Sequence, residues 1–167
     1  MIIVNDIIKA IESVAPLNWQ ESYDNAGLQV GGRFQSVSGA VVCLDVTEAV
    51  VDEAISMGYN LIVSHHPLLF KGLKSITGNS YVERIVIKAI QHNIAIYAAH
   101  TNLDNAPEGV SYRMARKLGL TSIRVLDPLC GRLIKLVTYV PSTHVESVRN
   151  ACLLYTSPSP RDGATSR

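Results

Sequence analysis

The chain has 167 residues, of which 47% are hydrophobic and 17% charged, and its formal net charge is +1. This length suits one ordinary domain with a sizeable core, and the composition excludes disorder over most of the chain. So small a net charge creates no overall field that attracts nucleic acid or an anionic membrane, and neither is an expected partner.

The N-terminal residues predict a helix followed by an irregular segment. Asn5 or Asp6 can cap the helix, its apolar face extends over residues 7–15, and Pro16 ends it. Residues 19–32 are expected to be irregular, because turn-forming residues precede a short apolar stretch there.

From residue 40 the chain alternates between short apolar strands and helices. Buried strands are expected at residues 40–44, 60–63 and 94–99. Helices are expected at residues 47–56, 81–91 and 108–118. This order predicts an α/β fold with a mainly parallel sheet, built from strand-helix-strand units with helices on its faces.

The last part of the chain departs from this alternation. Residues 133–140 predict a further strand, and Thr143 caps a short helix that reaches residue 151. Residues 156–167 have no apolar periodicity and predict disorder. We therefore expect residues 1–152 to form an α/β domain whose C-terminal part is missing, and residues 153–167 to be a foreign or disordered tail.

Neither export nor membrane insertion is expected. Charged residues interrupt the apolar N-terminus, and no apolar run approaches the roughly 18 residues that span a bilayer. The cysteines, Cys43, Cys130 and Cys152, are odd in number and form no Cys-x-x-Cys pair. We therefore expect reduced, buried thiols in a soluble, cytoplasmic protein.

Two adjacent histidines follow the second predicted strand. His65 and His66 come directly after it, and Pro67 marks the point where the chain leaves the sheet. Open α/β sheets bind ligands at these carboxyl ends of strands. In an extended segment the two imidazoles point to opposite sides, so they suit two ions, or one ion with the other histidine supporting its ligands, better than joint binding of a single ion. Alternatively, one histidine caps the strand through a hydrogen bond and the other is exposed.

A histidine and a carboxylate follow the next strand. His100 and Asp104 are expected on a loop at the same edge of the sheet, because neighbouring parallel strands end together. Imidazoles with one carboxylate are a donor set for a divalent transition metal. Taken alone, Asp104 is more typical of a helix-capping or loop aspartate. His92 and His144 are expected to be structural and exposed residues, respectively.

Three motifs follow one another along the chain: Asp24-Asn25-Ala26-Gly27-Leu28-Gln29-Val30-Gly31, Ser64-His65-His66-Pro67-Leu68 and His100-Thr101-Asn102-Leu103-Asp104. Motifs in this order resemble the NIF-three-like dinuclear metal-centre family, whose members are also called type 2 GTP cyclohydrolase I homologues. The resemblance covers about residues 1–152.

The resemblance implies two divalent metal ions (zinc, iron or manganese) and a ring-shaped homohexamer. By position, His65 and Asp104 would hold one ion and His66 the other, with His100 and the Asp24-Asn25 turn close by. Family members complete the centre with a histidine and a glutamate from a later segment, which this chain lacks. We therefore expect the chain as given to bind metal weakly and to be inactive.

The expected function is a metal-dependent hydrolase acting on a small molecule, which the resemblance suggests is a nucleotide. In this interpretation His100 is catalytic and moves a proton. The sequence has no Gly-x-x-x-x-Gly-Lys phosphate loop, and Lys71 and Lys74 are expected to be solvated surface charges. The alternative is a non-catalytic metal-binding scaffold or regulatory partner protein.

Overall fold

The computed structural model describes residues 1–126, 128 and 138–153. The chain divides into two compact units, Met1–Arg124 and Val125–Arg167. In chain order the elements of the first unit are α1 (Val4–Val14), η1 (Leu17–Trp19), β1 (Gly27–Val30), β2 (Ala40–Cys43), α2 (Glu48–Ser56), β3 (Leu61–Ser64), α3 (Tyr81–Gln91), β4 (Ala95–Ala98), α4 (Thr101–Asp104) and α5 (Val110–Lys117). The second unit contains η2 (Ser142–His144) and α6 (Val145–Leu153).

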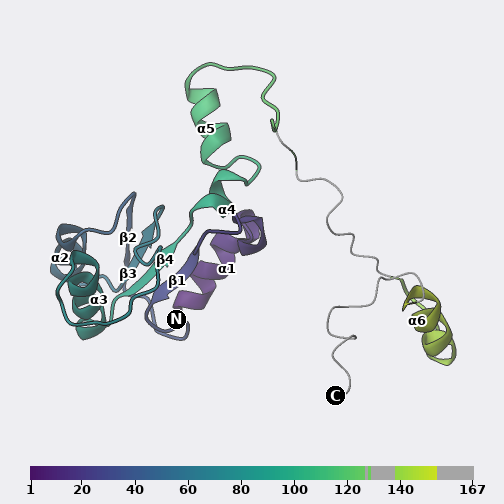
Figure 1. Cartoon of the computed structure of the whole chain (residues 1–167), viewed down its shortest axis with the longest axis horizontal. Helices are drawn as coiled ribbons and strands as arrows, with labels where there is room; N and C mark the ends of the chain where they lie inside the picture. The colour runs from purple at the N-terminus through teal and green to yellow at the C-terminus, as the bar shows by residue number, and fades with distance from the viewer. Residues whose placement is uncertain (127, 129–137, 154–167) are drawn as a thin grey trace. The chain divides into compact units, whose positions relative to one another are not determined.

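The first unit is built on a four-stranded sheet in the order β1-β4-β3-β2 (Figure 1). Strands β2, β3 and β4 are parallel, and β1 is antiparallel to β4. The prediction of an α/β fold with a mainly parallel sheet is therefore confirmed. Because β3 and β4 pair in parallel, with Ser64 opposite Ala98, the segments that follow these two strands leave the sheet at the same edge.

Alternate residues of the two central strands enter two apolar cores, one on each face of the sheet. Ile62 and Ile96 pack with α2 and α3 on one face. Leu61 and Tyr97 pack with α1 on the other. Figure 1 shows α1 on the opposite side of the sheet from α2 and α3. The two central strands are therefore covered on both faces, as is usual for parallel strands. The histidines follow the ends of these covered strands.

Three of the predicted helices are confirmed with small shifts in their ends. Thr47 caps α2 by accepting a hydrogen bond from the Val50 amide, at 3.2 Å. α3 occupies the predicted residues, and α5 begins two residues later than expected, at Val110. The cap of α1 was predicted wrongly: the Ile3 amide donates to the Asp6 carboxylate at 3.0 Å, so the helix begins at Val4 with Asp6 inside its first turn.

Two strand predictions were wrong. Residues 27–30, expected to be irregular, form β1; its next residue, Gly31, has φ of +92°, and a Cβ there would lie 2.8 Å from the Ala95 Cα. β2 was expected to be buried, but it is an edge strand and Val42 is 80% exposed. Apolar sequence alone does not distinguish an edge strand from a central one.

In the second unit the described residues include no strand. Residues 133–137 of the predicted strand lie outside the described residues, and residues 138–140 are not in a strand. Thr143 lies within η2, so it does not cap α6. The predicted tail falls almost entirely on residues 154–167, which are outside the described part of the chain. No helix in that described part has the length and apolarity of a membrane span.

Cys43 is a half-buried free cysteine. Burial, with the nearby Asp45 carboxylate, raises the pKa of its thiol above the ordinary value. The thiol is therefore protonated at neutral pH. Cys130 and the side chain of Cys152 lie outside the described part of the structure.

Glu83, in the first turn of α3, forms pH-dependent hydrogen bonds with the loop that precedes the helix. Its carboxylate accepts hydrogen bonds from the Thr77 amide and hydroxyl, both at 2.9 Å, from the Asn79 amide at 3.1 Å and from the Ser80 hydroxyl at 3.1 Å. These bonds, the one from the Thr77 amide foremost, lower the pKa of Glu83 from 4.5 to about 2.

Because the folded pKa lies below the unfolded one, this carboxylate stabilises the fold above pH 4.5 and loses its contribution as the pH falls towards about 2. Replacing Glu83 by glutamine is expected to lower the melting temperature at neutral pH, and the difference should shrink in acid. Thermal melts followed by circular dichroism across this range test it, with Glu53→Gln on the exposed surface of α2 as the matched control. A difference that stays constant with pH would contradict this role.

Candidate metal centre

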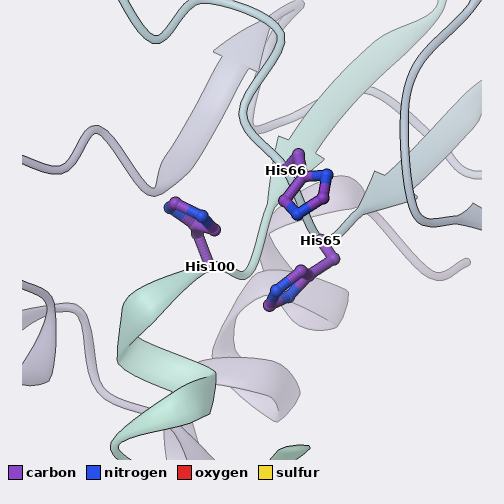
Figure 2. Close-up of side chains that lie close together, drawn as sticks. All are labelled: His65, His66 and His100. Atoms are coloured by element: carbon purple, nitrogen blue, oxygen red, sulfur yellow. The ribbon is translucent and has the colours of Figure 1, made fainter.

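Three imidazoles converge where β3 and β4 end. One ring nitrogen each from His65, His66 and His100 lies within 4.8 Å of the others. The ring centroids are 4.9 Å apart for His65 and His66, 5.3 Å for His65 and His100, and 5.6 Å for His66 and His100. Figure 2 shows the three rings gathered around one space, two from the segment after β3 and one from the start of α4. The parallel pairing of the strands brings them together.

The prediction that His65 and His66 point to opposite sides was wrong. β3 ends at Ser64, so the alternation of an extended strand does not continue through the pair. The backbone bends at His65 and His66, and within this bend the Ser64 hydroxyl donates to the His66 carbonyl at 2.9 Å. Both rings consequently face the same space as His100.

Each imidazole has its Nδ1 atom tied to an oxygen. Nδ1 of His65 lies 2.9 Å from the Ala99 carbonyl, that of His66 lies 2.7 Å from the Asp45 carboxylate, and that of His100 lies 2.8 Å from the Asp24 carboxylate. A carbonyl or an ionised carboxylate only accepts, so each Nδ1 donates its hydrogen. In the neutral rings the lone pair is then on Nε2. Such oxygen partners are typical of histidines that bind metal.

Asp104 lies beside His65, with its carboxylate 3.8 Å from the His65 Nε2. The loop predicted for this segment is instead the short helix α4, in which the Asp104 amide donates to the His100 carbonyl at 3.1 Å. One helical turn therefore places Asp104 on the same side as His100. The carboxylate, 32% exposed, adds an oxygen donor and a negative charge to the imidazoles.

Asp24 is a fully buried carboxylate that holds His100 and the start of α4. It accepts hydrogen bonds from the Thr101 amide at 3.1 Å, from the Thr101 hydroxyl and from the Asn25 amide at 2.6 Å, in addition to His100. Burial raises the pKa of Asp24, but the hydrogen bonds from Thr101, His100 and Asn25 outweigh it, so the pKa lies below 3.8. The turn at Asp24 and Asn25 thus contacts the histidine cluster through the ionised Asp24 carboxylate, which binds His100.

Asp45 is a member of the site that the sequence analysis missed. It follows β2, the third parallel strand, and so lies at the edge where His65, His66 and His100 emerge. A signal was present, because the rule that strand ends carry functional residues applies equally to the end of β2.

The other candidate residues lie outside the cluster. His92 follows the last residue of α3 and His144 is exposed, as expected. Lys71 and Lys74 are exposed and do not join the cluster. A cavity of about 450 Å³, lined among others by Leu103 and by α5 residues, includes none of the three histidines. The three imidazoles thus do not line this cavity.

The chain is similar to a group of bacterial proteins. A family model described as Duf34/NIF3 (NGG1p interacting factor 3) matches residues 2–156. A "GTP cyclohydrolase 1 type 2 homolog" of Halalkalibacterium halodurans is 43% identical over 146 residues, which cover 87% of this chain and 39% of that protein. Another of the same name, from Staphylococcus aureus strain MRSA252, is 41% identical over 85% of this chain and 38% of its own length. The chain therefore spans about two fifths of these relatives.

Solved structures give the same result. A Bacillus cereus protein related to NIF3 matches with a TM-score of 0.73 and 41% identity, over 90% of this chain and 42% of that chain. The Staphylococcus aureus hypothetical protein SA1388 matches with a TM-score of 0.70 and 43% identity, over 74% of this chain and 35% of that chain.

Proposed function

Because the chain belongs to the Duf34/NIF3 family, we propose that it contributes the centre of a metal-dependent hydrolase, with His65, His66 and Asp104 as metal ligands. The resemblance of the three motifs to this family is confirmed by the family model. Since the chain spans only 39% of a curated relative, the activity belongs to a protein of the relatives' length.

The observation that carries the proposal is the common orientation of the imidazoles. His65, His66 and His100 each donate from Nδ1 to an oxygen, which leaves Nε2 as the free donor in each neutral ring. Together with the Asp104 carboxylate, this is a donor set that suits zinc, iron or manganese. Three nitrogens and one carboxylate are enough for one ion. With two ions, as the family resemblance implies, the Nε2 of His100 stays free of metal and the ions require further ligands.

We assign each residue a role consistent with these contacts. When bound, divalent ions supply Lewis acidity and a water of lowered pKa. His65 and Asp104 would hold one ion and His66 the other, with the His66 ring oriented by Asp45. His100 accepts a proton at Nε2, because its Nδ1 is already donating to Asp24. The ionised Asp24 carboxylate then stabilises the resulting imidazolium.

The proposed substrate class is suggested by the name of the relatives. Their name refers to GTP cyclohydrolase, so we propose a small molecule of the nucleotide type as the substrate. Assembly into a homohexamer and a cytoplasmic location remain predictions that rest on the resemblance and on composition. A non-catalytic metal-binding scaffold is the alternative against which the hydrolase is tested.

The test joins residues 1–152 to the C-terminal part of the Halalkalibacterium relative, because this chain covers 39% of that protein. The metal-loaded fusion is assayed for hydrolysis of GTP and of a phosphodiester. Asp104→Asn should reduce kcat/KM by at least about 100-fold, since an amide neither balances the charge nor replaces the oxygen ligand. Asp52→Asn, which removes a surface ion pair with Lys88 on α3, is the matched control.

Equal activity of the Asp104→Asn fusion would contradict the assigned mechanism. Bound metal without turnover of either substrate would favour the scaffold.

A further inference from the structure

Phe70 is an aromatic residue at the rim of the histidine cluster. Its ring lies edge to face with the His100 imidazole, with centroids 6.3 Å apart and an angle of 88° between the planes. The side chain is 46% exposed. The preceding residues, Leu68 and Leu69, pack against the core beneath α2 and α3, whereas the Phe70 ring contacts the site. About half of Phe70 is thus accessible to a ligand beside His100, the candidate catalytic histidine.

The backbone that carries Phe70 is held by two amide side chains. The Leu69 amide donates to the Gln29 side-chain oxygen at 2.9 Å, and the Leu69 carbonyl accepts from the Asn25 side chain at 2.6 Å. The Gln29 side chain also donates to the Asn25 carbonyl at 2.6 Å. Asn25 follows Asp24, the partner of His100. One turn therefore holds both the backbone next to Phe70 and the His100 imidazole.

From these contacts we propose that Phe70 is a substrate-positioning residue whose exposed face packs against a planar, unsaturated ring of the ligand. This inference rests on the proposed function, because it assigns the ring a place in the same site. Aromatic partners in proteins pack with centroids about 4.5–7 Å apart, so a ring on Phe70 lies next to the imidazoles. Packing of this kind selects flat heterocycles over aliphatic or sugar groups, which lack a π-face.

The experiment compares two probes that differ only in a planar ring, guanosine 5′-monophosphate and ribose 5-phosphate, binding to the zinc-loaded 167-residue chain. Calorimetry should give at least about tenfold tighter binding of the nucleotide, since base stacking on an aromatic side chain supplies that much. Phe70→Leu should abolish this preference and leave the zinc content unchanged, and Phe70→Trp should keep it. Phe34→Leu is the matched control, because Phe34 is also exposed, at 83%, and the ring contacts of the three histidines in the described part of the chain do not include it.

A nucleotide preference that survives Phe70→Leu would overturn the inference, and so would the absence of any preference in the unsubstituted chain. Both results leave the metal centre intact, because zinc binding is measured separately. Failure of the proposed function has a different signature, namely zinc affinity that does not change in His65→Ala.

Discussion

Zinc binding is expected to weaken by at least about 100-fold when His65 is replaced by alanine, because even the partners of metal-binding histidines contribute 10- to 100-fold. The His65 Nε2 faces the Asp104 carboxylate at 3.8 Å, and its Nδ1 is fixed by the Ala99 carbonyl at 2.9 Å. The substitution removes the His65 imidazole, which belongs to the histidine cluster and also lies next to the Asp104 carboxylate. Competition against a chromophoric chelator, at constant pH, measures the affinity.

His92→Ala is the matched control for this prediction. His92 is an exposed histidine at the end of α3 and is not a member of the cluster. Its removal should leave the zinc affinity as it is in the unsubstituted chain. If both variants lose affinity equally, or neither loses any, zinc is bound elsewhere and the His65 assignment fails.

The largest effect on stability is expected at Asn102, which is fully buried. Its side-chain nitrogen donates to the Ala15 carbonyl at 2.7 Å, and its side-chain oxygen accepts from the His100 amide at 2.9 Å. Asn102→Ala removes both bonds and leaves two backbone groups without these partners. At about 1–3 kcal/mol for each buried group left unsatisfied, we expect the free energy of unfolding to fall by about 3 kcal/mol.

Asn105 offers a close comparison in the same segment. Its side-chain nitrogen donates to the Trp19 carbonyl at 2.8 Å, but the residue is exposed, so water can replace the bond. Asn105→Ala should lower the free energy of unfolding by less than about 1 kcal/mol. Urea unfolding of the two variants, followed by far-ultraviolet circular dichroism, compares them. Equal losses would show that burial of Asn102 does not determine its contribution.

The parts of the fold that sequence predicted correctly are those determined by local pattern. The apolar runs at β3 and β4 are continuous because both strands are central and covered on both faces. The cap of α2 uses the hydroxyl of Thr47, which accepts from the backbone amide three residues ahead. Parallel pairing then places His65, His66 and His100 at one edge without further information.

The parts that sequence did not predict depend on contacts between distant segments. β1 is a strand because it pairs with β4, and its own four residues carry too weak a pattern to show this. Val42 is exposed because β2 lies at the edge of the sheet, which its apolar sequence does not reveal. Asp45 belongs to the site because the chain bends after Ser64 and turns the His66 ring towards it, at 2.7 Å.

Anomalous diffraction from crystals of the zinc-loaded chain, recorded on both sides of the zinc absorption edge, tests the centre most directly. A zinc peak is expected about 2.0–2.2 Å from Nε2 of His65 and from a carboxylate oxygen of Asp104, the usual zinc–ligand distances. Zinc located away from the three imidazoles, or bound through Nδ1 with the oxygen partners displaced, would contradict the account.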